Sequence, residues 1–292
     1  MVQRNWLDKI KLHMNIIKKL DPLYKMNFNV ILLFKTIKNR KFLFLLLVNL
    51  FMNFGFCFAL TEEARTKGFV YLHEIDPTII ISLRYNSSEN FLGTCVDSYK
   101  KPVLIITEQA AMALKEVQTA VKKDGYSLVV YDAYRPQQAV NHFMRWSKDP
   151  KEQSKKPQYY PRIDKAKVFE LGYVAEKSAH SRGSTVDVTL IKLKNCLHTV
   201  KEKSRTLLDG FKITFLDDGT VDMGSSFDLF DIASHYNSNV ISKSYKSLRT
   251  YLKNIMGKHG FKNCAEEWWH FTLKKEPFSA NQDSSYFNFA IE

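Results

Sequence analysis

The stretch SAHSRGSTVDVTL, residues 178–190, combines a candidate metal ligand, a glycine turn and a predicted strand. Its second part, 184–191, alternates small polar and apolar side chains, which is typical of a β-strand with one buried face. His180 precedes this strand, and Asp187 lies seven residues further on, within it. Gly183 gives the backbone freedom to turn between them. A loop residue and a strand residue can therefore converge on one point at the sheet.

A second histidine, His270, closes the sequence EEWWH, in which Glu266 and Glu267 precede it. Catalytic zinc sites use about three protein ligands of nitrogen or oxygen type and keep one position open for water. His180, Asp187 and His270 meet this requirement. A carboxylate close to the metal, but not bound to it, can take a proton from that water. The sequence therefore predicts a zinc site with a neighbouring general base.

Glu267 is the preferred candidate for this base, and Glu266 is the competing one. Glu267 lies three residues before His270, so the two side chains share a face only if the chain turns at 268–269. Glu266 would share a face with His270 in a regular strand. A purely structural role for all these polar residues is the alternative. The remaining histidines of the chain body have no acidic or histidine neighbour at a suggestive spacing: His73, His142, His198, His235 and His259.

Helical and strand patterns are mixed along the chain. The expected helices are 106–125, 136–146 and 244–260, and the expected strands are 126–134, 184–191 and the two ends of 261–273. Short connections between such elements favour antiparallel pairing. No internal repeat or low-complexity linker divides residues 61–292. We therefore expect a single α+β domain, with a mainly antiparallel sheet flanked by helices and the zinc site on the sheet.

The positive charge of the chain is concentrated at the N-terminus. The formal net charge is +13, and residues 1–60 hold 10 Lys/Arg and 2 Asp/Glu, a net of +8, which leaves +5 for the remaining 232 residues. Nucleic-acid binding is therefore not expected. The basic run 38–41 followed by the apolar run 42–60 indicates an export signal or a membrane anchor. This predicts an exported, periplasmic protein that contacts a membrane only through this segment.

Two further features concern processing. Ala59 offers a possible cleavage point, and Met26 would give the signal a basic region of ordinary length.

None of the four cysteines forms a C-x-x-C pair, so a cysteine zinc site has no support. Of these, Cys95, Cys196 and Cys264 lie outside the N-terminal segment, so they could form at most one disulfide.

Four motifs occur in the order YDAYRP (131–136), SAHSRGSTVDVTL (178–190), MGSSFDLFD (223–231) and EWWH (267–270). Together they resemble the D-alanyl-D-alanine dipeptidases, which are zinc D,D-peptidases related to the hedgehog fold. The resemblance covers about residues 70–292. Further matching stretches are RYNSSENFLG (84–93), YYPRID (159–164) and GYVAEKSAHSRG (172–183).

The resemblance implies a role for each motif residue. His180, Asp187 and His270 would bind one zinc ion, and Glu267, rather than the glutamate before it, would be the general base. Arg135 would stabilise the charged tetrahedral intermediate, as a fixed guanidinium can do through charge-assisted hydrogen bonds. The implied reaction is hydrolysis of the D-Ala-D-Ala dipeptide.

The resemblance also implies a pocket for the free amino group of the dipeptide, formed by Asp228, Tyr85 and Ser178. A closed pocket of this kind would exclude longer or blocked substrates. The stretch 191–221 is longer than the family needs and could reshape the rim of the pocket. One alternative is a D,D- or L,D-carboxypeptidase that acts on longer peptidoglycan stems. Another is a zinc-binding module without catalysis, which the presence of both Glu267 and Arg135 disfavours.

Overall fold

The computed structural model describes residues 60–278, 281 and 283–292, and the chain from Ala59 to Glu292 forms one compact unit. The predicted signal or anchor at 42–60 and the possible start at Met26 fall almost wholly outside the described residues. Within the described ranges, none of the helices has the length and apolar character needed to cross a membrane. Cys95, Cys196 and Cys264 are free thiols.

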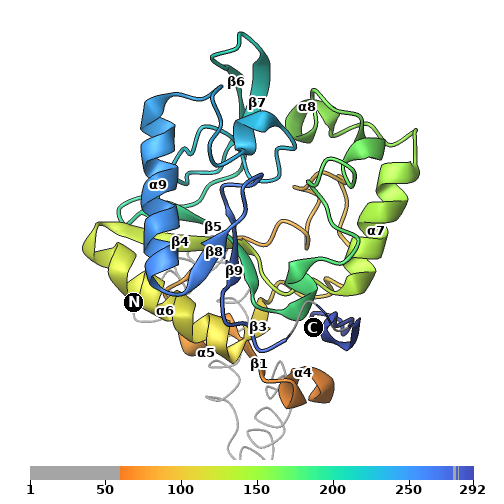
Figure 1. The fold of residues 1–292 in the computed structure, drawn as a ribbon, viewed down its shortest axis with the longest axis vertical. Helices are drawn as coiled ribbons and strands as arrows, with labels where there is room; N and C mark the ends of the chain where they lie inside the picture. Colours follow the sequence, from red (N-terminus) through yellow and green to blue (C-terminus); the bar gives the residue numbers. More distant parts are fainter. Residues whose placement is uncertain (1–59, 279–280, 282) are drawn as a thin grey trace, which may run out of the picture. The chain divides into compact units, whose positions relative to one another are not determined.

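Helices and strands are mixed along the described chain (Figure 1). The α-helices are α4 (Glu62–Thr66), α5 (Leu72–Ile75), α6 (Glu108–Lys123), α7 (Gln137–Lys148), α8 (Lys156–Tyr159) and α9 (Lys243–Lys258). The strands are β1 (Phe69–Tyr71), β2 (Ile80–Ile81), β3 (Ile105–Thr107), β4 (Tyr126–Asp132), β5 (Thr185–Lys192), β6 (Lys201–Thr206), β7 (Lys212–Asp217), β8 (Phe261–Asn263) and β9 (His270–Leu273). The 3₁₀ helices are η1 (Lys165–Lys167), η2 (Ala179–Arg182), η3 (Ile232–Ser234) and η4 (Asp283–Ser285).

The main sheet has five strands in the order β2-β4-β5-β9-β8. The pairs β4–β5, β5–β9 and β8–β9 are antiparallel, whereas β2 lies parallel to β4. The α+β class is therefore confirmed, and the sheet is antiparallel except at one edge. Two smaller sheets, β1–β3 and β6–β7, each have two strands.

Helices cover the sheet because they bury apolar stripes against it. In α6 the buried positions recur at three and four residues, and this helix packs against β4 and α9. Helix α9 packs against β8 in turn, whereas α7 lies on the opposite side of Figure 1. Seven of the eight residues of β5 are buried, all except Lys192. The prediction that this strand buries one face was wrong, since β5 is the central strand and is covered on both faces.

The segment 261–273 contains two strands with a turn between them. Strands β8 and β9 pair with each other, and Trp268–Trp269 form the turn that precedes β9. The backbone N–H of His270 donates to the carbonyl of Glu267 at 3.3 Å. The predicted turn is therefore confirmed, and it removes the strict alternation of a regular strand between these two residues.

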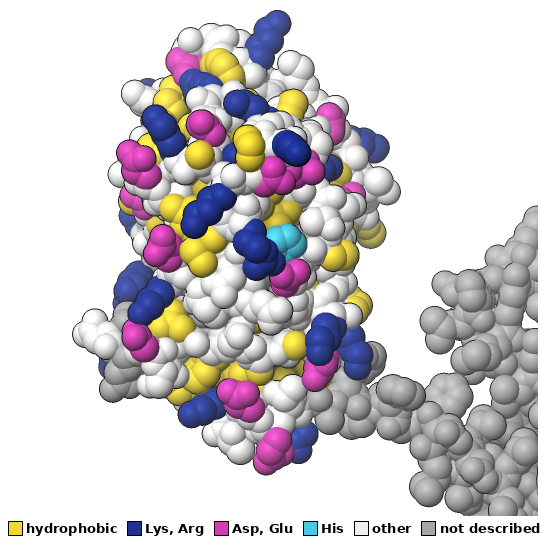
Figure 2. Space-filling view, turned by 90° about the vertical axis from the view of Figure 1, so that its right-hand side faces the viewer, with side chains coloured by type: hydrophobic (Ala, Val, Ile, Leu, Met, Phe, Trp, Pro, Cys, Tyr) yellow, Lys and Arg dark blue, Asp and Glu magenta, His cyan; other side chains and the backbone are white. Residues whose placement is uncertain are grey.

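Charge is mixed on the surface of this unit. On the face drawn in Figure 2, Lys and Arg side chains alternate with Asp and Glu. Such interspersed charges lack the basic stripe that nucleic-acid binding proteins present.

Gly183 is expected to be intolerant of a side chain. It ends η2 with φ at +80°, and a Cβ there would lie 2.2 Å from the Phe69 ring. We expect Gly183→Ala to lower the free energy of unfolding by about 2–5 kcal/mol, combining left-handed strain with overpacking. Urea denaturation measures this change.

Gly125 supplies the matched control, because its φ is +83° and a Cβ there meets no atom within 4 Å. Gly125→Ala should therefore lower the free energy of unfolding by only about 1–2 kcal/mol. Equal losses in the two variants would contradict the importance of the Phe69 contact.

Candidate active site

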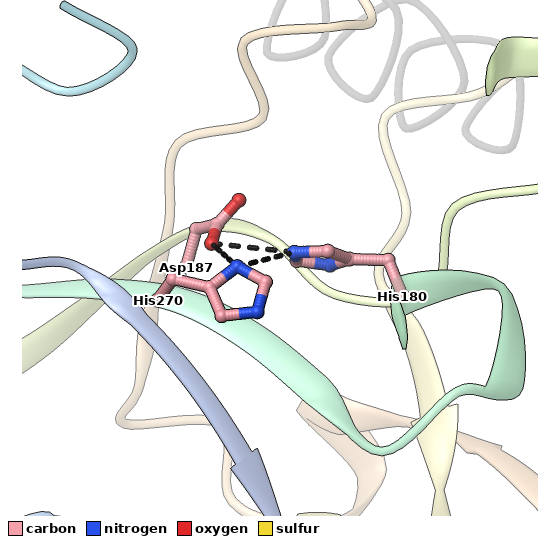
Figure 3. A group of neighbouring side chains, drawn as sticks. All are labelled: His180, Asp187 and His270. Atoms are coloured by element: carbon pink, nitrogen blue, oxygen red, sulfur yellow. Dashed lines mark hydrogen bonds and ion pairs between the residues drawn. The ribbon is translucent and has the colours of Figure 1, made fainter. Parts of the chain in front are cut away.

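Three side chains from separate elements meet at one point (Figure 3). His180 comes from η2, Asp187 from the middle of β5, and His270 from the first position of β9. Asp187 and His270 are direct partners in the β5–β9 register, which places both side chains on the same face. Among the described residues, they form the only group of three or more His, Cys, Asp or Glu side chains suited to holding a metal ion.

The three facing atoms form a nearly equilateral triangle. Asp187 Oδ1 lies 3.3 Å from His180 Nε2 and 3.2 Å from His270 Nδ1, and the two ring nitrogens are 3.2 Å apart. Ligands of a tetrahedral zinc ion at 2.0–2.1 Å are separated by about 3.3 Å. Asp187 Oδ1 is buried and accepts no hydrogen bond. The donor set and its spacing therefore fit a zinc ion.

Neighbouring groups set the tautomer of His180 and keep Asp187 ionised. The Nδ1–H of His180 donates to the carbonyl of Ala133 at 2.6 Å, since a carbonyl can only accept, and this turns the lone pair of Nε2 toward the triangle. Burial by itself would raise the pKa of Asp187, but the neighbouring His180 and His270 hold it below its usual range. Asp187 is therefore ready to bind a cation as a carboxylate.

Glu267 reaches the same place through the turn before β9. Its Oε2 lies 3.5 Å from His270 Nδ1. Burial, together with the carboxylates of Asp187 and Asp228, raises the pKa of Glu267 well above its usual value. Glu266 instead accepts a hydrogen bond from the thiol of Cys264 at 3.1 Å. The structure therefore brings Glu267, and not Glu266, to the candidate metal ligands.

Arg135 lies beside this group as a buried, oriented cation. Its Nε donates to Asp132 Oδ2 at 2.8 Å, and Nη2 lies 3.4 Å from Asp187 Oδ2. The guanidinium also lies over the rings of Tyr85 and Phe143, 5.0 and 5.2 Å from their centres. Planar stacking and paired hydrogen bonds hold an arginine in one orientation. Arg135 can therefore stabilise negative charge that develops next to the triangle.

Sequence reasoning gave no role to Asp132, which the structure places behind the site. Its Oδ2 binds Arg135 and lies 3.5 Å from His180 Nδ1, and its Oδ1 accepts from the hydroxyl of Tyr99 at 2.6 Å. Asp132 thus orients both a candidate catalytic residue and a candidate ligand. The available signal was its place in the motif YDAYRP.

Asp228 and Tyr85 form a second buried pair in the site. The hydroxyl of Tyr85 donates to Asp228 Oδ2 at 2.8 Å. Burial and the carboxylate of Asp187 raise the pKa of Asp228 well above its usual value. Asp228 also has φ at 58°, which is uncommon outside glycine. A buried carboxylate held in a strained backbone position is a common feature of ligand sites.

All of the predicted site residues line one pocket of about 260 Å³. They are Tyr85, Arg135, Ser178, His180, Asp187, Asp228, Glu267 and His270. Ser178 also caps η2, because its Oγ accepts from the backbone N–H of His180 at 3.3 Å. The volume lies below the range of about 300–1,000 Å³ that is usual for drug-sized ligands. A small polar molecule therefore suits this pocket.

The raised pKa of Asp228 predicts a pH-dependent effect on stability. In the unfolded chain this carboxyl ionises near pH 3.9, but burial favours its neutral form in the folded protein. The free energy of unfolding should therefore fall as pH rises above about 4. We expect Asp228→Asn to be more stable than the wild type at pH 7 and equally stable below pH 4.

Urea denaturation of the metal-free protein at pH 4 and pH 7 tests this expectation. Asp283→Asn is the control, because the Asp283 side chain is 89% exposed and its ion pair with Lys177 lies at the surface, where such pairs contribute little to stability. An Asp228→Asn variant that differs from the wild type by the same amount at both pH values would contradict the expectation.

Comparison with known proteins adds an independent finding. A family model described as D-ala-D-ala dipeptidase matches residues 65–200 and 209–292. The unmatched residues 201–208 contain β6 and fall within the stretch 191–221 that was predicted to be longer than the family needs.

Curated relatives match over nearly their whole length. A D-alanyl-D-alanine dipeptidase of Enterococcus faecalis is 36% identical over 226 residues, covering 77% of this chain and 98% of the relative. One from Streptomyces coelicolor is 35% identical, covering 77% and 99%, and one from Escherichia coli is 30% identical over 224 residues, covering 76% and 94%. The chain therefore belongs to the D-alanyl-D-alanine dipeptidase family, peptidase M15.

Proposed function

We propose that this protein is a zinc-dependent dipeptidase that hydrolyses D-Ala-D-Ala to two molecules of D-alanine. The observation that carries the proposal is the triangle of His180, Asp187 and His270 in one small pocket with Glu267 and Arg135. Relatives that match nearly end to end are named D-alanyl-D-alanine dipeptidases. Both the chemistry of the pocket and its size support a short peptide substrate.

In this proposal, His180, Asp187 and His270 hold one zinc ion. A bound zinc ion supplies Lewis acidity and lowers the pKa of water. Glu267 takes a proton from the attacking water and returns it to the amide nitrogen that leaves. The raised pKa of Glu267 suits this role, since it makes the carboxylate a stronger base.

The other pocket residues position and stabilise the reacting groups. Arg135 donates hydrogen bonds to the oxyanion that develops from the peptide carbonyl, and Asp132 keeps the guanidinium in place. Asp228, Tyr85 and Ser178 bind the free amino group of the substrate. A substrate without this charge would leave the buried Asp228 unpaired, which disfavours blocked peptides.

The test is a hydrolysis assay with zinc-loaded protein that begins near Thr61. Release of D-alanine from D-Ala-D-Ala, but not from the amino-acetylated dipeptide, is the expected result. Cleavage of a longer stem peptide alone would shift the assignment to a D,D- or L,D-carboxypeptidase. Zinc binding without hydrolysis of either substrate would favour a non-catalytic zinc module.

We also propose that residues 1–60 direct export, so that the enzyme acts in the periplasm or remains anchored through this segment. The basic run 38–41 followed by the apolar run 42–60 supports this proposal. N-terminal sequencing of the mature protein tests it. A mature N-terminus near residue 60 is expected, and an intact Met1 on a protein recovered in the cytoplasm would contradict it.

A further inference from the structure

The charges of the pocket pose a problem for a zwitterionic substrate. Asp187, Asp228 and Glu267 all line the pocket, so its inner part is rich in carboxylates. A free ammonium group finds hydrogen-bond acceptors there, whereas the carboxylate at the other end of a dipeptide finds no cationic donor among these three side chains. A pocket that binds a short dipeptide therefore needs a separate cation for this end.

Three cationic side chains line the pocket, and two of them are already engaged. Arg135 binds Asp132 and lies next to Asp187. Arg182 binds Glu276 through both Nε and Nη2, each at 2.9 Å, and only 7% of its side chain is exposed. Breaking either buried pair would leave a charge uncompensated. Arg182 is therefore not available to bind a substrate carboxylate without a large penalty, and Arg135 is already assigned to the oxyanion that develops at the peptide carbonyl.

The third cation, Lys177, is held only loosely. Its side chain is 58% exposed, and its ammonium pairs with Asp283, whose side chain is 89% exposed. Its ammonium also lies 5.6 Å from the centre of the Tyr286 ring. Exposed ion pairs of this kind contribute about 0–1 kcal/mol. A substrate carboxylate can therefore replace Asp283 at little cost.

The position of Lys177 in the chain also suits this role. It directly precedes Ser178, which caps the 3₁₀ helix that carries His180. The lysine is therefore tied to the metal ligands by a short, capped segment, whereas Asp228 and Tyr85 reach the pocket from other parts of the chain. Groups from different elements are therefore available for the two charged ends of a dipeptide.

We propose that Lys177 binds the free carboxylate of the dipeptide, and that Asp283 occupies this position when substrate is absent. Lys177 is then a specificity-determining residue that limits the substrate at its carboxyl end. This inference rests on the proposed dipeptidase function and extends it, since the enzyme would require both ends of the substrate to be free.

The experiment compares Lys177→Met with the wild type on D-Ala-D-Ala and on its carboxamide. KM for the free acid should rise roughly 10- to 100-fold in Lys177→Met, because a hydrogen bond between two charged groups is lost. KM for the carboxamide, which lacks the charge, should be similar in the two proteins. Lys177→Arg should restore most of the affinity for the free acid.

Asp283→Asn separates substrate binding from a merely structural role of the ion pair. If Asp283 only holds Lys177 in place, its loss should raise KM as Lys177→Met does. If Asp283 competes with the substrate, its loss should leave KM for D-Ala-D-Ala unchanged or lower. Lys115→Met, an exposed position on α6, is the control for removal of a surface charge.

The outcomes distinguish the inference from the function on which it rests. A wild type that does not hydrolyse D-Ala-D-Ala overturns the proposed function and this inference with it. An active wild type whose Lys177→Met variant keeps the same KM for the free acid overturns the inference alone. Parallel rises of KM for the acid and the carboxamide also overturn it, because the lost interaction would then not depend on the carboxylate.

Discussion

Glu267→Gln is expected to lower kcat for D-Ala-D-Ala by about 10²- to 10⁴-fold, which is the usual contribution of a general base. Glutamine keeps the size and the hydrogen-bonding oxygen of Glu267 but cannot take a proton at neutral pH. Zinc content should stay at that of the wild type, since His180, Asp187 and His270 remain in place. Metal analysis and steady-state kinetics on the same preparation measure both quantities.

Glu266→Gln is the matched control for this variant. The Glu266 carboxylate accepts a hydrogen bond from Cys264 and does not line the pocket, although it is the immediate neighbour of Glu267 in sequence. Its replacement should change kcat by less than about threefold, because glutamine keeps the size of this half-buried side chain, which makes no contact with the candidate metal ligands. A large loss in Glu266→Gln with an active Glu267→Gln would reverse the assignment of the base.

These two glutamates show what sequence spacing alone cannot decide, because it does not fix which of them faces His270. A regular strand would turn Glu266 toward His270, and a turn would favour Glu267. In the sequence, Glu267 was the preferred candidate with Glu266 as the competing one, and the resemblance to a family selected Glu267. The structure gives the physical reason, since the turn at Trp268–Trp269 breaks the alternation just before β9 begins at His270.

The main helices and strands could be predicted from local sequence patterns. The predicted helices 106–125 and 244–260 correspond to α6 and α9, and the strand 126–134 corresponds to β4. Their apolar periodicity is set by the face that each element buries. The burial of β5 on both faces could not be predicted. It depends on the central position of this strand in the sheet, and local alternation does not encode that position.

For the site, the sequence likewise indicated the candidate metal ligands but not the residue that orients them from behind. Ligand types and the motif order indicated His180, Asp187 and His270, and the structure places their donor atoms 3.2–3.3 Å apart. Asp132 received no role, because its partners Arg135 and Tyr99 are identified only once the chain is folded. Hydrogen bonds that orient a metal ligand from behind rarely have a fixed spacing in sequence.

His270→Ala is expected to weaken zinc binding by roughly 10²- to 10³-fold. Zinc sites bind with about 10–16 kcal/mol shared among about four ligands, so one ligand accounts for roughly 3–4 kcal/mol. The loss also removes one of the two imidazoles that keep the pKa of Asp187 low, which makes this carboxylate a poorer ligand. Hydrolysis of D-Ala-D-Ala should fall at least in proportion when zinc is limiting.

Competition with a chromophoric chelator measures the affinity of His270→Ala for zinc directly, independently of turnover. His73→Ala is the control, because His73 is exposed on α5 and lies outside the pocket, so its zinc affinity should match that of the wild type. Excess zinc should restore part of the bound metal in His270→Ala, since two ligands remain. Wild-type zinc affinity in His270→Ala would place the metal elsewhere and remove the main support for the proposed mechanism.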